Sequence, residues 1–394
     1  MDPQTRESTE EDIEQIAAIR QEAFRRPTTV APWLNGSGRV VARESEVCGI
    51  ARAEPAGQYF GGRRVSSAGI TSVAVGVRFR KQGIARRLLG DVLREQRDQG
   101  VSLAALYPSS PTLYRGLGFE VAGTRFTYST TVMDGKTMPD DGSLDSVWSE
   151  WSDSMLAEIS ECYEEFASHR NGVLSRERSW WDQFITYAGV SGPLYCFRVY
   201  DGSRLVGYAL CSHEPADGRT PYDFWVHVRD IAYLTGNAAA TLVSFLTSQW
   251  PYQRGVSWPG PPADPLFRVF ASSVVAVESS YPWMLRILNL QSALEDRGYP
   301  AGASASTALA VSDPLLPENS RRVRIEVSEG RACVSDTREN AAAVDVGTLA
   351  AIYTGWLSPR DASRLGLLEG AQEDHLANLE LMFTGQTPWI SEFF

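Results

Sequence analysis

The sequence has few of the residues that build disulfide frameworks and metal sites. It contains five cysteines and four histidines among 394 residues. The cysteines are odd in number, scattered and without a CxxC pair, and the histidines show no ligand spacing. We therefore expect reduced thiols and a cytoplasmic protein, because disulfides persist mainly in oxidising compartments. We also expect no metal site, since zinc and similar ions need clustered ligands.

Long apolar runs and an excess of basic charge are also missing. No stretch of about eighteen apolar residues occurs, and "MDPQTRESTEEDIEQ" lacks the basic and apolar regions of a signal peptide. The formal net charge is -11 at pH 7, whereas binding to nucleic acid needs a basic surface. We therefore expect neither a membrane nor a nucleic acid as partner.

The chain is too long for one hydrophobic core, and the order of its predicted elements divides it into three domains. Residues 1–134 predict a helix, strands, a strand–loop–helix unit, and a strand, helix and strand before a turn-rich linker. Residues 135–280 begin with a helical region at "WSEWSD" and then repeat strands and a strand–helix unit without a glycine loop. Residues 281–394 predict a strand and helix, the hairpin "RRVRIEVSEGRACVSDT" and further helices. This order predicts α/β or α+β domains.

The segment "SVAVGVRFRKQGIARRLLGDVL" carries the clearest chemical signal. Arg80, Gly83 and Ala85 form an R-x-x-G-x-A pattern between a strand and the first turn of a helix. Unpaired N–H groups and the positive end of the dipole make a helix start suitable for a diphosphate. Gly83 has no Cβ to keep phosphate oxygens away. Taken alone, the pattern is more often a solvent-facing turn, but it lies in a basic island that suits a nucleotide 3′-phosphate: Arg78, Arg80, Lys81, Arg86 and Arg87.

The surroundings of this pattern resemble the GCN5-related N-acetyltransferase (GNAT) family. The residues that carry the resemblance are Val73-Ala74-Val75 upstream, and Ser109 and Tyr114 after the strand "VSLAALY". The resemblance implies acetyl-CoA as co-substrate, with its pantetheine arm on the backbone of a bulged strand at Val73, Ala74 and Val75. It implies that Ser109 lies near the acyl end and that Tyr114 is the general acid for the departing thiolate; the alternative is a core tyrosine. It assigns the pyrophosphate to a loop of Arg80, Lys81, Gln82, Gly83, Ile84 and Ala85.

Segments along nearly the whole chain resemble the Eis (enhanced intracellular survival) acetyltransferases. They are "GVLSRERSWW" (172–181), "VRDIAYLTGNAAATLVSFL" (228–246), "WMLRILNLQSAL" (283–294), "VDVGTLAAIYTGWLSP" (344–359) and the apolar C-terminus. The resemblance implies an α+β chain of two tandem GNAT-fold domains, the second degenerate, followed by a sterol-carrier-protein-like domain. The implied ranges are 1–134, 135–280 and 281–394. It also implies a homo-oligomer, a hexamer built as a trimer of dimers.

The chain stops at "TPWISEFF" (387–394), a tail with four large apolar side chains. Leaving such side chains in water forfeits roughly 1.5–3 kcal/mol each, so we expect the tail to be buried. The Eis resemblance implies that the last carboxylate reaches the first domain's active site, where Phe394 would be the general base for the substrate ammonium. Burial would make this carboxylate a better base, and amides near Val73 would steady the oxyanion. The alternative is a tail that only fills an interface.

The resemblance also implies an acceptor pocket that contains Phe24, Arg26, Trp33 and Phe393. The aminoglycoside-acetylating mycobacterial type has acidic residues near the end of the first helix and next to last in the chain. This chain has Arg25-Arg26 and Phe393 there. Because polycationic aminoglycosides need acidic walls, the sequence favours a less charged, more aromatic primary amine. It identifies neither the natural acceptor and its regiochemistry nor an acyl preference beyond acetyl.

Two other functions stay open at this point. A non-catalytic CoA-binding or regulatory protein would keep the fold but transfer nothing, and it predicts no turnover across a panel of amines. A protein lysine acetyltransferase would use the same residues, and an open, flat mouth to the site would favour it. The sterol-carrier resemblance does not indicate lipid transport, because a fold does not imply a function.

Overall fold

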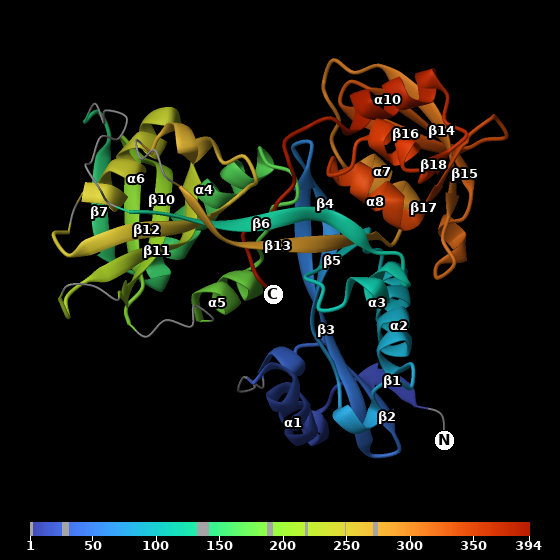
Figure 1. The fold of residues 1–394 in the computed structure, drawn as a ribbon, viewed down its shortest axis with the longest axis horizontal. Coiled ribbons are helices and arrows are strands. Elements are labelled where there is room, and N and C mark those ends of the chain that lie inside the picture. The colour runs from blue at the N-terminus through green and yellow to red at the C-terminus, as the bar shows by residue number, and fades with distance from the viewer. Residues whose placement is uncertain are drawn as a thin grey trace. The chain divides into compact units, whose positions relative to one another are not determined.

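The computed structural model describes residues 3–25, 31–131, 142–186, 192–216, 220–248, 250–270 and 275–394. It forms two compact units (Figure 1). Unit 1 contains Met1–Gly123, Pro282–Gln386 and Phe393–Phe394, and unit 2 contains Thr124–Tyr281 and Thr387–Glu392. The unit boundaries fall within strands β6 (Glu120–Thr131) and β13 (Ala276–Ile287). The predicted boundary at residue 134 lies outside the described residues, and the three-domain division stays a prediction.

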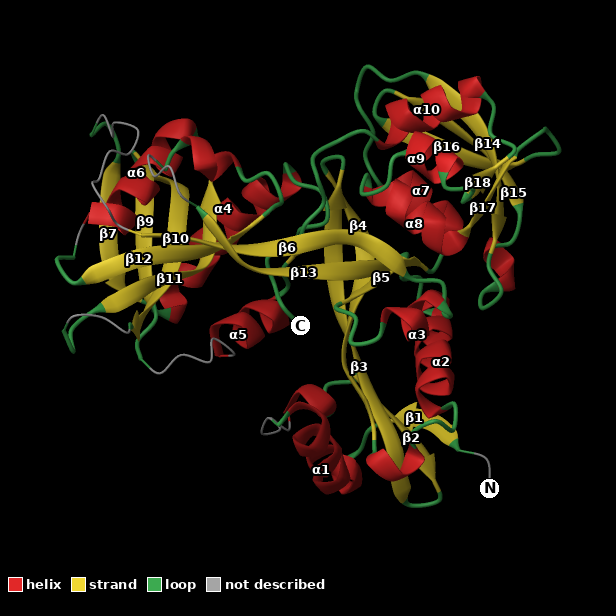
Figure 2. Ribbon diagram, in the orientation of Figure 1, coloured by secondary structure: helices red, strands yellow, loops and turns green. Residues whose placement is uncertain are grey.

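The first part of unit 1 is a sheet with strand order β1-β2-β3-β4-β5-β13 (Figure 2). Its strands alternate with helices as the sequence predicts. The elements are β1 (Gln4–Glu7), α1 (Ile13–Phe24), β2 (Gly38–Arg43), β3 (Glu46–Phe60), β4 (Arg63–Val75), α2 (Ile84–Asp98), β5 (Leu103–Leu106) and α3 (Pro111–Arg115), with short 3-10 turns at Glu10–Asp12, Ala31–Trp33 and Val77–Phe79.

Helices α1 and α2 pack against this sheet and contribute to two separate hydrophobic cores. The predicted apolar face of α2 is buried, with Leu88, Leu89 and Leu93 all fully enclosed. Ile16 and Ile19 of α1 belong to another core, which includes Ala74 of β4. Successive side chains of a strand point to opposite faces, so β4 contributes to both cores. Gly100 follows α2 with φ +84°, as predicted for a glycine that ends a helix.

The second part of unit 1 contains a five-stranded sheet of order β16-β15-β14-β17-β18. Its core holds a buried cation: the Arg297 guanidinium lies 4.7–5.0 Å from the ring centres of Tyr299, Tyr353 and Phe383. The elements are α7 (Leu290–Asp296), β14 (Ala305–Ser312), a 3-10 turn (Pro317–Asn319), β15 (Arg322–Ser328), β16 (Arg331–Asp336), β17 (Ala342–Asp345), α8 (Val346–Thr354), α9 (Pro359–Arg364), β18 (Leu368–Glu369) and α10 (Glu373–Phe383).

Unit 2 is a sheet of order β6-β12-β11-β10-β9-β7, on which α4 and α6 pack. The predicted turn between β9 and β10 is present at Gly202, whose φ is +58°. The elements are β7 (Asp145–Glu150), α4 (Leu156–Ser168), β8 (Leu174–Ser175), α5 (Arg178–Thr186), β9 (Tyr195–Asp201), β10 (Arg204–Pro215), β11 (Phe224–Tyr233), α6 (Gly236–Ser248) and β12 (Gln253–Gly260), with 3-10 turns at Asp153–Met155 and Pro265–Arg268.

The predicted start of one helical region is wrong. The sequence predicts a helical region from Trp148, but β7 (Asp145–Glu150) is a strand there, and helical structure begins at Asp153. Trp148 pairs with Phe197 of β9 and stacks on the Tyr195 ring, with 4.9 Å between ring centroids. Tertiary pairing therefore decides the conformation of this segment rather than local helical periodicity.

The described residues contain neither a helix that could span a membrane nor a cluster that could bind a metal ion. None of the helices in the described ranges combines the length and hydrophobicity needed to cross a bilayer. Within the same ranges, no three or more His, Cys, Asp or Glu side chains gather in a way that could hold a metal ion.

Candidate active site

Strand β4 carries a bulge at the predicted pantetheine position. Ile50 of β3 pairs with Ala74 and Arg52 pairs with Thr71, so Ser72 and Val73 together oppose a single residue. Ser72 has φ +54°, a conformation that non-glycine residues seldom adopt. The parallel ladder between β4 and β5 covers only Ser67–Gly69. Beyond it, within a stretch that is described without gaps, the two strands part and leave the β4 backbone near Val73 without a partner strand on that side.

Gly83 marks the end of the predicted pyrophosphate loop and the start of α2. Its φ is +77°, in the left-handed region that favours glycine, and a Cβ added there would meet no atom within 4 Å. Gly83 also has no side chain, so the N-cap residue makes no side-chain hydrogen bond to the first-turn N–H groups of α2. Lys81 is left-handed as well, with φ +61°, and the Arg80 Nε donates to the Val75 carbonyl at 3.3 Å. The loop thus fits an anionic diphosphate.

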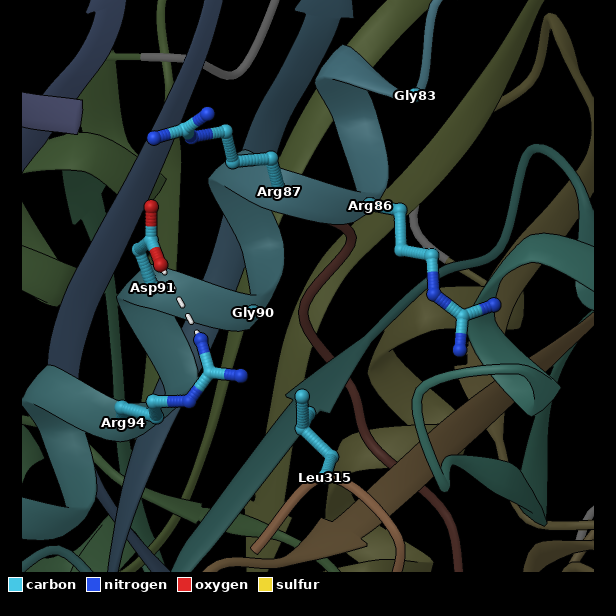
Figure 3. A pocket seen from close by; sticks show the side chains of 7 residues that line it. All are labelled: Gly83, Arg86, Arg87, Gly90, Asp91, Arg94 and Leu315. Atoms are coloured by element: carbon cyan, nitrogen blue, oxygen red, sulfur yellow. Dashed lines mark hydrogen bonds and ion pairs between the residues drawn. The ribbon is translucent and has the colours of Figure 1, made fainter. Parts of the chain in front are cut away.

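A cavity of about 360 Å³ runs from Gly83 along α2 (Figure 3). Three arginines line it, and Figure 3 shows that Arg94 turns toward Asp91, to which it pairs at 3.2 Å, whereas Arg86 points away from that pair. Among the described residues, neither Arg86 nor Arg87 has an acidic partner. The lining residues are Gly83, Arg86, Arg87, Gly90, Asp91, Arg94 and Leu315.

Tyr114 lies on α3, in the same core as Ile84 of α2, and the partly buried Val73 and Val75 pack against this core. Its side chain is buried, and the ring makes an edge contact with Phe119 at 6.0 Å. Burial raises the pKa of Tyr114, while a hydrogen bond from the Ser109 side chain lowers it by less. The phenol is therefore protonated at neutral pH, and the structure brings together Tyr114, Ser109 and the bulged strand.

The C-terminal tail is only partly buried, so that expectation needs correction. Trp389 and Ile390 are buried, whereas Phe393 is 51% exposed and Phe394 is half-buried. The centroid of the Tyr107 ring lies 4.6 Å from that of Phe393 and 5.5 Å from that of Phe394. The Phe393 ring thus contacts Tyr107 while about half of its surface faces water. Sequence reasoning missed Tyr107, although its place directly after β5 is where the fold concentrates site residues.

The predicted acceptor residues are less closely grouped. Phe24 ends α1 and is 40% exposed, while Trp33 is fully buried in the core that contains Ala74. Trp33 and Tyr114 thus belong to the two cores that β4 separates. The guanidinium groups of Arg20 and Arg52 each lie 5.9 Å from the Trp33 ring centre. Arg26 lies outside the described residues.

Three family models match parts of the chain. Models described as acetyltransferase (GNAT) domains match residues 4–122 and 172–287. A model described as a sterol carrier protein domain matches residues 290–391.

Individual proteins are similar over most of the chain. An uncharacterized N-acetyltransferase of Streptomyces griseus is 26% identical over 85% of this chain and 83% of its own. The N-acetyltransferase Eis of Mycobacterium tuberculosis is 26% identical over 96% of this chain and 95% of its own. The crystal structure of a GCN5-related N-acetyltransferase from Anabaena variabilis superposes with a TM-score of 0.91, at 27% identity and full coverage of both chains.

Proposed function

The chain belongs to the Eis-like GCN5-related N-acetyltransferases, and we propose that it transfers acetyl from acetyl-CoA directly to a primary amine of a small molecule. It is an N-acetyltransferase with two tandem GNAT-fold domains and a sterol-carrier-like domain, as the sequence predicts. One observation carries the finer proposal. The bulged strand β4, the open Gly83 loop and the buried Tyr114 meet around one core.

The residues around Gly83 fit coenzyme A. First-turn N–H groups of α2 would hold the diphosphate, with Arg80, Lys81, Gln82, Ile84 and Ala85 around it, and Arg86 and Arg87 supply positive charge for a further phosphate. The backbone of Val73, Ala74 and Val75 would pair with the pantetheine arm, and Ser109 would lie at the acyl end. When bound, the co-substrate supplies an acetyl group activated as a thioester.

Two groups of this chain would move the protons. The Phe394 carboxylate takes a proton from the substrate ammonium, and the neutral nitrogen forms the new amide bond to the acetyl carbon. As the carbon–sulfur bond breaks, the Tyr114 hydroxyl donates its proton to the sulfur, and the second proton that leaves the nitrogen restores the phenol. The Val73 N–H would face the acetyl carbonyl oxygen, which gains negative charge as the nitrogen attacks. The segment after β5 supports this proposal. The Tyr107 ring contacts the Phe394 ring, and Ser109, two positions further along, forms a hydrogen bond with Tyr114.

The acceptor we propose is an aromatic amine of low positive charge rather than a polycation. Phe24 and Phe393 each expose two fifths or more of their surface, so both rings offer apolar area that an aromatic substrate could cover. The guanidinium groups of Arg20 and Arg52 lie near the Trp33 ring, and Arg52 forms an ion pair with Glu54. A second or third ammonium on the substrate would meet repulsion near these guanidinium groups.

A screen of small amines with acetyl-CoA, read by release of free thiol, tests the proposal. We expect turnover with aromatic primary amines, and we expect loss of turnover after deletion of Phe394. Addition of one glycine after Phe394 moves the carboxylate without changing the fold, and it should have a similar effect. Absence of thiol release with every amine would favour the regulatory alternative, and acetylation of lysine peptides alone would favour the protein-directed one.

We also propose that the chain forms a hexamer, a trimer of dimers, in the cytoplasm. The support is its similarity to Eis over nearly its whole length. Sedimentation velocity at several concentrations tests this, with a single species of six chains expected.

A further inference from the structure

The second GNAT-fold copy has a charged site at a bulge that corresponds to the one in β4. Leu210 of β10 pairs with Asp230 and Cys211 pairs with Val228, so Arg229 is the extra residue of β11. Ile231 belongs to the core under α6, so its neighbour Asp230 points to the opposite face. In the first copy, the residues after the bulge are apolar. In the second copy they include a buried carboxylate.

Asp230 is held there by a buried arginine. The Arg176 side chain has no exposed surface, and its Nη1 and Nη2 donate to the two Asp230 oxygens at 2.6 and 2.9 Å. The Tyr208 hydroxyl donates to Asp230 at 2.5 Å. The rings of Tyr163 and Trp181 lie 3.8 and 4.5 Å from the Arg176 guanidinium. A paired, ring-enclosed guanidinium of this kind is fixed in position.

The remaining donors of Arg176 bind the C-terminal tail. Its Nε donates to Glu392, and its Nη2 donates to the Ser391 hydroxyl at 3.0 Å. Tyr163 also donates to Glu392, at 3.1 Å. Backbone contacts continue the attachment: the Arg125 Nε donates to the Ser391 carbonyl at 2.8 Å, and the Trp389 N–H donates to the Asn171 carbonyl at 3.0 Å. The tail thus occupies the bulge region of the second copy through charge and hydrogen bonds.

We propose that Arg176, held by Asp230, is a positioning residue that clamps Glu392 and so restricts the movement of the chain end that carries the Phe394 carboxylate. This rests on the proposed function of Phe394 as the base. Two residues of extended chain span about 7 Å, so clamping Glu392 confines the carboxylate to a small volume. Without the clamp, the carboxylate visits the productive geometry less often, which lowers kcat more than it changes the binding of acetyl-CoA.

Glu392→Gln tests this, because it removes the charge and keeps the shape. We expect kcat to fall about tenfold while KM for acetyl-CoA stays within twofold. Carboxypeptidase A should release phenylalanine from the C-terminus of the variant about tenfold faster than from the wild type. Arg176→Lys, which keeps the charge but loses the fork, should act in the same direction. Glu158→Gln is the matched control, because Glu158 pairs with Arg198 in the same unit rather than with Arg176; it should change neither readout.

The outcomes separate the clamp from the base. Wild-type rates of phenylalanine release and of turnover in Glu392→Gln would overturn the clamp. Full turnover after deletion of Phe394 would instead overturn the base, while the release assay still reports on the clamp. A fall in kcat with an unchanged release rate would also contradict the proposal, because the clamp acts only by holding the tail.

Discussion

The two GNAT-fold copies differ most where a strand leads into a helix. In the first copy, β4 and α2 are joined by residues 76–83, and the helix start at Gly83 has no side-chain cap. In the second copy, β11 and α6 are joined only by Leu234 and Thr235, and the Thr235 hydroxyl accepts a hydrogen bond from the Ala238 N–H at 3.1 Å. A long uncapped joint leaves N–H groups for an anion, whereas a short capped joint satisfies them internally.

The copies differ again after the next strand. Leu113-Tyr114-Arg115 follows β5, and Leu266-Phe267-Arg268 follows β12, each on a short helix that begins with proline. The second copy thus has no hydroxyl where the first has the proposed acid. The comparison indicates that few local changes separate a copy that can bind and react from one that serves as structure.

The largest expected effect comes from giving the first copy the residue of the second. Tyr114→Phe removes the proton donor, so we expect kcat to fall by roughly 10²–10⁴-fold with little change in KM for acetyl-CoA. Steady-state assay of thiol release measures both. Phe267→Tyr is the control and should leave kcat unchanged; a Tyr114→Phe enzyme with nearly wild-type kcat would refute the assignment.

The residue before the proline gives a second contrast, Ser110 in one copy and Asp264 in the other. Burial raises the pKa of Asp264 to about 6, against about 3.9 for an unfolded aspartate. Between these two pKa values the folded protein binds more protons than the unfolded chain. The free energy of unfolding therefore falls as pH rises from about 4 to 6, and above that range Asp264 causes no further change. The contribution of Asp264 to this fall is on the order of 3 kcal/mol. Urea unfolding of wild type and Asp264→Asn at pH 4 to 7 checks it: the variant should lack this part, and equal slopes would contradict it.

Gly83→Ala tests the open joint. The left-handed φ should cost the fold about 1–2 kcal/mol, and the new Cβ lies where phosphate oxygens approach. We expect KM for acetyl-CoA to rise about tenfold, which corresponds to about 1.4 kcal/mol. The matched change Gly236→Ala, at the start of α6, should leave KM unaltered. If both variants raise KM equally, the loop has no special role.

Thr235→Ala opens the capped joint and should have the smallest effect. Loss of the cap costs about 1 kcal/mol of stability, and turnover should stay at the wild-type value because α6 takes no part in binding. Urea unfolding and the thiol assay measure the two quantities. A loss of turnover without a loss of stability would contradict the inference that the start of α6 takes no part in the reaction.

Much of this arrangement could be predicted from the sequence. The apolar face of α2, the hairpin at Gly202 and the glycine at position 83 follow from local rules of spacing and backbone conformation. Tyr114 and Val73 both contribute to the core under α2, while their roles stay a prediction of the family resemblance. These features depend on residues near one another in the chain, or on a motif that fixes their relation.

The rest depends on contacts between distant residues. The pairing of Trp148 with Phe197 turned a predicted helix into a strand, and nothing near Trp148 signals this. Nothing near Glu392 in the sequence indicates its role, because its partner Arg176 lies 216 positions away. Complete burial of Trp33 between two guanidinium groups is likewise set by tertiary packing.

Arg297 limits what the sterol-carrier-like domain can carry. A hydrocarbon tail that entered between Tyr299, Tyr353 and Phe383 would have to expel the guanidinium or share a dry space with it. Either outcome breaks the hydrogen bonds that Arg297 donates to the Gly298 and Tyr353 carbonyls, and the second also leaves a charge beside hydrocarbon, which a few buried methylene groups do not offset. Arg297 therefore disfavours a lipid chain in this part of the core.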